Sequence, residues 1–215
     1  MKLIDALARV LALDQPAFRT SDAAVCLRLD RSHASKTLER LADAGHLIRL
    51  ARALWGVPGR IEPFALPEYL AAPFPAYVSL HSALFHHGMV SQIPSVIYAV
   101  TVGRARRRET PIAVISCHHV APSFFFGYES HGPGGIKIAT PEKALLDVLY
   151  LGAGRSQGLS ALPEVELPRE FSIGESRQMI ARIGSPERRR RVEERLAAVL
   201  AASHAGLRDR GADIP

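Results

Sequence analysis

Cysteine is scarce in this sequence. There are two cysteines, Cys26 and Cys117, and they lie far apart in mostly apolar surroundings. So small a number excludes a disulfide framework and a cysteine-rich zinc site. Because free cysteine is commonly buried, we expect two buried, reduced thiols.

Long apolar segments are missing as well. No window approaches the roughly 20 apolar residues that a membrane-spanning helix needs. The opening stretch MKLIDALARV carries charges inside its apolar run, unlike a signal peptide. We therefore expect a cytoplasmic protein with no membrane partner.

Acidic residues are outnumbered by basic ones. The sequence has 21 Asp and Glu against 27 Lys and Arg, for a net charge of +6. A basic surplus of this size permits an anionic partner such as nucleic acid but does not prove one. With 215 residues, of which 47% are hydrophobic and 22% charged, the chain is globular and long enough for one large or two small domains.

The first 57 residues form one predicted domain. Apolar residues recur at helical spacing in residues 2–13, and a proline break with a short extended piece to Thr20 then precedes a second helix. Asp30 or Ser32 caps a third helix that ends at Gly45. Its predicted buried positions are Ala34, Leu38 and Leu41. Two apolar runs, HLIRLA and ALWGV, then predict strands joined at Arg52. Three helices followed by a two-stranded hairpin are typical of a winged helix-turn-helix domain.

Short polar and basic side chains dominate the outer face of the third helix and the hairpin. In such a domain the third helix enters the major groove, and arginines at the hairpin tip contact the phosphate backbone or enter the minor groove. The predicted DNA-binding residues are Arg31, Ser32, His33, Ser35, Lys36, Arg40, Arg49 and Arg52. We place Arg49 and Arg52 at the hairpin tip. Winged helices also bind proteins, so a protein-binding role stays open for this face.

The remainder divides into three predicted parts. Five prolines in residues 58–75 predict an interdomain linker without regular elements, because each removes a backbone donor, although parts of it such as LPEYLA can pack. A second domain follows at residues 76–205, and a flexible tail at residues 206–215. In the second domain YVSLHSALFHHG and TPEKALLDVLYLG predict helices, whereas SVIYAVTVG, PIAVISCH, SFFFGYES and GIKIAT predict strands.

Two arginine-rich runs occur in the second half. The run RARRR stands between two predicted strands with few acidic neighbours, which predicts a hairpin tip. It forms a candidate accessory basic surface for DNA, RNA or an acidic partner. Its members are Arg104, Arg106, Arg107 and Arg108. In the second run, at residues 187–195, Glu and Arg lie three and four apart on a predicted helix and form a self-compensated face.

Catalytic and metal-binding patterns are weak. Neighbouring residues of a strand point to opposite faces, so only one of His118 and His119 could join a site, and no zinc spacing is present. Glu142, Lys143 and Asp147 lie on one predicted helix, where we expect structural roles. We predict no catalytic residues, no metal, no cofactor and no enzyme activity.

Two stretches of the second half are distinctive, SLHSALFHHGM and IATPEKALLD. With the N-terminal domain, they resemble the AbiEi-like antitoxins, transcriptional regulators of abortive-infection type IV toxin–antitoxin systems linked to viral defence. The resemblance covers nearly the whole chain. It implies an α+β fold, in which an N-terminal winged helix-turn-helix domain is joined by a Pro-rich linker to a mixed α/β C-terminal antitoxin domain.

The same resemblance implies partners. Proteins of this family repress their own operon by binding inverted repeats of double-stranded DNA in its promoter. They counteract a nucleotidyltransferase-like toxin, and members differ in whether they contact it directly. Arg104–Arg108 then become a candidate antitoxin surface. Two alternatives stay open: a winged-helix regulator whose C-terminal domain senses a ligand or dimerises without a toxin partner, and a nuclease that uses residues 129–131.

Overall fold

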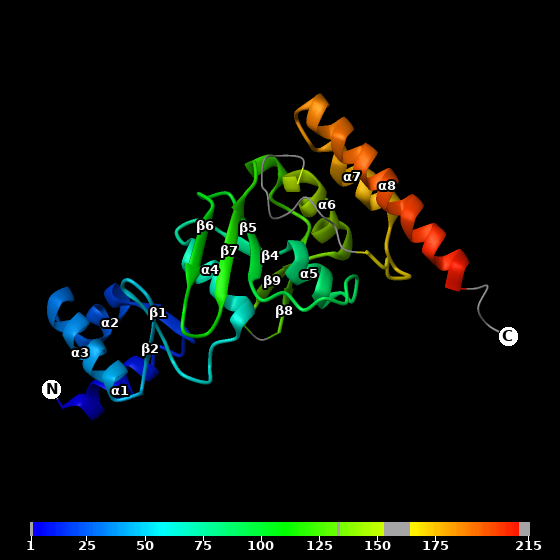
Figure 1. Ribbon diagram of the computed structural model, residues 1–215. Helices are drawn as coiled ribbons and strands as arrows, with labels where there is room; N and C mark the ends of the chain where they lie inside the picture. The colour runs from blue at the N-terminus through cyan, green and yellow to red at the C-terminus, as the bar shows by residue number, and fades with distance from the viewer. Residues whose placement is uncertain (1, 133, 153–163, 211–215) are drawn as a thin grey trace.

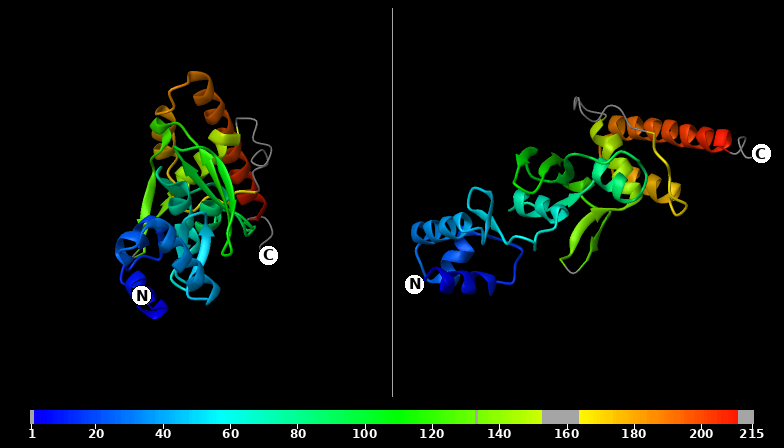
Figure 2. Two further views of the ribbon diagram at one scale, coloured as in Figure 1. Left: turned by 90° about the vertical axis from the view of Figure 1, so that its left-hand side faces the viewer. Right: turned by 60° about the horizontal axis from the view of Figure 1, so that its bottom comes forward.

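The computed structural model describes residues 2–132, 134–152 and 164–210, with side chains up to residue 203. The fold is α+β, as expected. An N-terminal unit of three helices and a small sheet lies at one end, a six-stranded sheet in the middle, and a pair of C-terminal helices at the other end (Figures 1 and 2). Among the described helices, none is both long and apolar enough to cross a membrane.

The N-terminal unit combines three helices with three short strands. The strands pair in the order β1-β3-β2, and both pairings are antiparallel. Its elements are α1 (Leu3–Leu11), β1 (Ala17–Arg19), α2 (Thr20–Leu27), α3 (Arg31–Asp43), β2 (Ile48–Ala51) and β3 (Leu54–Gly56). The predicted helices and hairpin are therefore confirmed as elements, whereas β1 brings a third strand to the hairpin.

Helix α3 forms where its sequence pattern predicts. Asp30 caps it by accepting hydrogen bonds from two backbone N–H groups of the first turn. The predicted positions Ala34, Leu38 and Leu41 are fully buried. Gly45 follows the helix at φ +77°, a conformation that glycine adopts without steric cost.

Regular elements were not expected in the linker at residues 58–75, and this is wrong in part, whereas the stretch LPEYLA packs, as the sequence allowed. The segment contains a 3₁₀ turn, η1 (Pro63–Ala65), and a helix, α4 (Leu66–Ala71). Helix α4 packs on the middle sheet, where Leu66 is fully buried. Proline is accepted in the first turn of a helix because the N–H groups there have no intrahelical partner, so Pro67 does not prevent α4.

Six strands form the middle sheet in the order β6-β7-β5-β4-β9-β8. The β5·β7 and β4·β9 pairs are parallel and the other three are antiparallel. The strands are β4 (Ala76–Val78), β5 (Ile97–Thr101), β6 (Arg106–Glu109), β7 (Val114–His119), β8 (Tyr128–His131) and β9 (Ile136–Ala139). Strands β6 and β8 are therefore the two edges.

Two strand predictions need correction. Tyr77 and Val78 were expected to begin a helix but belong to β4, an inner strand that is buried along its whole length. A short apolar run of this kind fits a buried strand or a buried helix equally well. Residues 104–108 were expected at a hairpin tip, yet Arg106–Arg108 lie in edge strand β6 and pair with β7. An edge strand accommodates charged side chains because both of its faces reach solvent.

Four helices complete the second half. They are α5 (Leu80–His86), α6 (Pro141–Gly152), α7 (Ile173–Ala181) and α8 (Pro186–Arg210), with a 3₁₀ turn η2 at Pro122–Phe124. Helix α6 contacts α5, α7 and α8 and is buried almost all round. Helix α8 extends to Arg210, which corrects the tail boundary at residue 206. The rest of the expected tail, residues 211–215, lies outside the described residues.

The two cysteines are unpaired, as expected. Cys117 is buried in the core of the second half. Cys26 is only half-buried, which departs from the expectation, and its thiol lies 3.1 Å from the backbone carbonyl of Arg9. Burial raises the pKa of the Cys117 thiol to about 11. Cys117 is therefore a protonated, structural thiol at neutral pH.

Candidate nucleic-acid interface

The predicted contact residues of α3 and the β2–β3 hairpin lie at the surface. Ser35 is half-buried and the other seven are exposed. The hydroxyl of Ser35 lies 3.4 Å from a carboxylate oxygen of Glu39, one turn further along the helix. All eight side chains are therefore accessible to solvent. Two local arrangements determine which of them lie close together.

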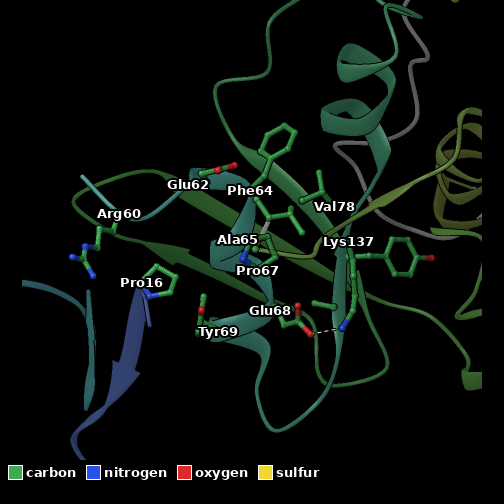
Figure 3. Close-up of a pocket in the computed structure, with 14 residues that line it drawn as sticks. Pro16, Arg60, Glu62, Phe64, Ala65, Pro67, Glu68, Tyr69, Val78 and Lys137 are labelled. Carbon is green, nitrogen blue, oxygen red and sulfur yellow. Dashed lines mark hydrogen bonds and ion pairs between the residues drawn. The ribbon is translucent and has the colours of Figure 1, made fainter. Parts of the chain in front are cut away.

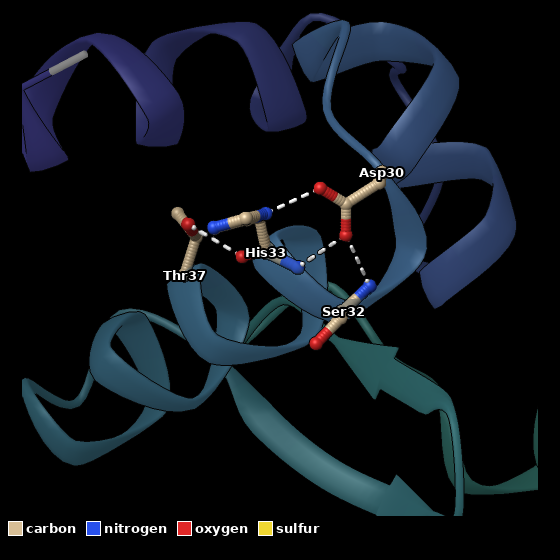
Figure 4. A network of polar contacts seen from close by, with 4 residues as sticks. All are labelled: Asp30, Ser32, His33 and Thr37. Atoms are coloured by element: carbon tan, nitrogen blue, oxygen red, sulfur yellow. Dashed lines mark hydrogen bonds and ion pairs between the residues drawn. The ribbon is translucent and has the colours of Figure 1, made fainter.

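The first arrangement is a polar network at the start of α3 (Figure 4). One carboxylate oxygen of Asp30 accepts from the backbone N–H groups of Ser32 at 2.9 Å and His33 at 3.0 Å. The other accepts from the Nδ1 of His33. These bonds, above all the one from the His33 backbone, lower the pKa of Asp30 to about 2. Since Asp30 already occupies these N–H groups, a phosphate at this end of α3 must be held by side chains.

The second arrangement is an open hollow between the start of α3 and the hairpin. It has a volume of about 490 Å³. Its lining residues are Arg19, Thr20, Arg31, Ser35, Arg49, Arg52, Ala53 and Trp55. Four are arginines and none is acidic. Guanidinium groups gathered without carboxylates at a surface hollow create a positive potential suited to phosphate oxygens.

The small sheet assembles this hollow from separate parts of the chain. Arg49 lies within β2 rather than at the tip, which corrects its predicted place, and its register partner is Trp55. Its guanidinium carbon lies 5.6 Å from the centre of the Trp55 ring. The ring is buried, and its Nε1 donates to the hydroxyl of Thr20 at 2.8 Å. Arg52 occupies the turn between the strands, as predicted.

Pairing of β1 with β3 adds a residue that sequence reasoning missed. Arg19 lies opposite Leu54, and this register places Arg19 beside the hairpin. The extended stretch before α2 was visible in the sequence, but its strand partner was not. Of the predicted residues, Arg31, Ser35, Arg49 and Arg52 are brought together, whereas Ser32, His33, Lys36 and Arg40 lie elsewhere on α3.

The second predicted basic surface lies on a different element. Arg104, Arg106, Arg107 and Arg108 are exposed on β6 and the segment before it. Strand β6 belongs to the middle sheet and the arginine hollow to the N-terminal unit. The structure therefore presents two separate basic surfaces.

Another cavity lies between η1, α4 and the sheet (Figure 3). Its volume is about 190 Å³, below the roughly 300 Å³ at which small-molecule sites begin. The charged side chains of Glu68 and Lys137, both in its lining, form an ion pair with each other. This cavity offers little room for a ligand.

A buried charged cluster occupies the core of the second half. Lys143 and Asp147 on α6 are fully buried and form an ion pair. Asp147 also accepts hydrogen bonds from the hydroxyls of Tyr77 at 2.9 Å and Ser79 at 2.7 Å. Burial lowers the pKa of Lys143, and the Asp147 carboxylate opposes that shift. The Lys143 ammonium lies 3.8 Å from the ring centre of Phe124. Because these groups are buried away from solvent, we assign them a structural role.

Two of the candidate histidines bond backbone carbonyls. His87 bonds the carbonyl of Ala139 at 2.7 Å, and His119 bonds that of Gly103 at 2.9 Å. In the described parts of the chain, no three metal-binding side chains come together in a group that could hold an ion.

Comparison with known proteins does not show a family for this chain. No protein-family model matches the chain, and no curated protein matches it. A solution structure of the antibiotic-resistance factor ANT(2'')-Ia is similar at a TM-score of 0.30 and 11% identity, over 68% of this chain and 94% of that chain. A likeness at this level carries no argument about the function of this chain.

Proposed function

We propose that residues 1–57 form a winged helix-turn-helix domain that binds double-stranded DNA, and that the chain is a repressor–antitoxin of the AbiEi-like kind. The arginine hollow carries the DNA-binding part. It joins the start of α3 to the hairpin, the two elements of a winged helix that contact DNA, and it has four arginines and no acid in its lining.

Other features of the N-terminal unit also support this surface as the DNA contact. Lys36 and Arg40 are exposed further along α3 and add two positive charges to the helix, beside the exposed carboxylate of Glu39. Leu50 and Leu54 of the small sheet belong to the same hydrophobic cluster as the middle sheet, while α3 lies on the far side of the unit (Figure 1). A duplex lying along α3 could thus meet the hairpin without meeting the second domain.

The antitoxin part rests on the sequence resemblance. Its two distinctive stretches form α5 and the junction of β9 with α6, which belong to the core of the second half. We propose that this domain counteracts a nucleotidyltransferase-like toxin encoded beside it, while the N-terminal domain represses the operon by binding inverted repeats.

A reporter fused to the promoter upstream of the gene tests the repressor role. The chain should silence this reporter, and Arg49→Ala with Arg52→Ala should restore expression. The matched control, Arg177→Ala with Arg190→Ala, removes the same charge from exposed positions on α7 and α8 and should still repress. Full repression by the Arg49/Arg52 variant would count against the hollow as the DNA contact.

Co-expression tests the antitoxin role separately. If an adjacent gene encodes a nucleotidyltransferase-like protein, its expression alone should arrest growth, and the chain should restore growth. Absence of such a gene, or arrest that the chain does not relieve, would favour a winged-helix regulator without a toxin partner.

A further inference from the structure

Strand β6 is an exposed sheet edge composed mainly of arginine. It pairs with β7 on one side only, and all four of its residues are exposed. Arg104 lies in the segment just before it and is also exposed. Within the described residues, no arginine of this group forms an ion pair. The charge of this edge is therefore free for a partner.

A small hollow adjoins the edge on one face of the sheet. Arg106 pairs in register with Cys117 and Arg108 with Ile115, so these two arginines share a face. The hollow on that face has a volume of about 100 Å³. Its lining combines apolar residues from α4 and the sheet with three of the arginines: Leu70, Ala71, Ala72, Pro73, Phe74, Thr101, Gly103, Arg104, Arg106, Arg108, Ile115 and Cys117.

Phe74 forms an exposed wall of this hollow. The residue is 48% exposed, which is unusual for a large apolar residue. The ring lies against Gly103, where an added Cβ would approach a ring carbon to 2.7 Å. The absence of a side chain at Gly103 therefore lets the ring lie beside the arginines.

We propose that β6 binds an acidic, extended segment of another protein by strand addition. The outer edge of β6 supplies backbone N–H and C=O groups for a sixth pairing in the sheet. One apolar side chain of the segment enters the hollow beside Phe74. Carboxylates on either side of it pair with Arg104, Arg106 and Arg108, since guanidinium groups bind carboxylates with two parallel hydrogen bonds.

The arginines, the unpaired strand edge and the apolar hollow together favour a polypeptide as the partner over duplex DNA or a small molecule. Duplex DNA would use the arginines but neither the backbone edge nor the apolar hollow. A small-molecule site is larger, roughly 300 Å³ or more. The proposal does not depend on DNA binding by the N-terminal domain, because it concerns a different element.

The test is a selection of random twelve-residue peptides displayed on phage against the full chain. Recovered sequences should place Asp or Glu on both sides of an aliphatic or aromatic residue. Arg106→Gln with Arg108→Gln should weaken binding of the synthetic peptides roughly tenfold or more. Arg177→Gln with Arg190→Gln removes equal charge at the other end of the molecule and should change binding by less than about twofold.

Two further readouts separate strand addition from simple charge attraction. Two series of peptides, methylated on one or the other alternate set of backbone nitrogens, keep their side chains; the series whose methylated nitrogens face β6 loses strand pairing and should not bind. Hydrogen exchange should slow at β6 amides when the unmethylated peptide is bound. The proposal is overturned if no selected peptide depends on Arg106 and Arg108, if both methylated series bind as well as the unmethylated peptide, or if duplex DNA slows exchange at β6 and displaces the peptide.

Discussion

The position of the Arg49 side chain depends on contacts that the local sequence does not predict. Its guanidinium rests over the Trp55 ring, and Thr20 fixes that ring through the indole nitrogen. Such stacking orients the guanidinium and leaves its N–H groups available for phosphate oxygens. Arg49 is therefore held toward the hollow, whereas Arg52 in the turn has more freedom.

The proposed phosphate contacts of the helix and the hairpin lead to a prediction about DNA affinity. Lys36→Ala with Arg52→Ala should weaken binding to promoter and unrelated DNA alike, because phosphate contacts carry no sequence information. The slope of log affinity against log salt should fall by about 2, roughly 1 for each contact. Fluorescence anisotropy titrations at several salt concentrations measure both quantities. An unchanged affinity and slope would remove these residues from the interface.

Asp30 leads to a prediction about pH. Its pKa of about 2 lies below its ordinary value of 3.8, because the His33 backbone, the His33 ring and the Ser32 backbone all bond the carboxylate. A lowered folded-state pKa means that this stabilisation is complete above about pH 4 and is lost as the pH falls through about 2.

Carbon-13 NMR of the Asp30 carboxyl group checks this directly. The midpoint should lie near 2, and His33→Ala should move it upward, because the ring hydrogen bond is lost while the backbone bond remains. Titration of the wild-type carboxyl near 3.8 would contradict the capping geometry.

At the scale of elements, helix α6 matches its sequence signals and also departs from them. Its start at Pro141 after Thr140 is as predicted, and the backbone N–H of Lys143 donates to the Thr140 hydroxyl at 3.3 Å. The expected structural roles of Lys143 and Asp147 agree with their complete burial. Periodicity could not show that α6 lies among three other helices, because those contacts come from distant parts of the chain.

The buried pair in α6 gives a prediction about stability. Asp147→Leu should lower the free energy of unfolding by about 3–5 kcal/mol, because it leaves the Lys143 ammonium without a counter-charge and two buried hydroxyls without an acceptor. Lys143→Met should cost less, since Asp147 keeps its bonds from Tyr77 and Ser79. Urea unfolding of both variants shows which of them loses more free energy of unfolding. An equal or larger loss for Lys143→Met would contradict this account of the cluster.

The strands divide into those that local pattern predicts and those that it does not. Strands β2 and β3 are joined by a short turn, and the sequence predicted both. Strands β4 and β6 were misassigned by the local pattern, and the extended piece at β1 was predicted without its partner β3, which is distant in sequence. The arginine hollow was therefore predictable in its α3 and hairpin members but not in Arg19, which β3 positions.

Across the whole molecule, the N-terminal unit and the α7–α8 pair lie at opposite ends, with the middle sheet between them (Figure 2). Helix α8 is anchored by Arg188, which donates to the Tyr150 hydroxyl at 2.8 Å, whereas Arg190 and Arg191 pair with glutamates on their own helix. That self-compensation agrees with the sequence expectation for residues 187–195. Within the described residues, the arginines of the hollow and of β6 form no ion pair.

The most direct test of the central claim is a titration of the full chain against its own upstream promoter fragment and a scrambled fragment, at two salt concentrations. Our account predicts tighter binding to the promoter fragment, with an affinity that falls steeply as salt increases, because several arginines displace counterions from the DNA backbone. Weak binding that is equal on both fragments would contradict a sequence-reading role for α3 and leave the N-terminal unit as a basic protein-interaction domain.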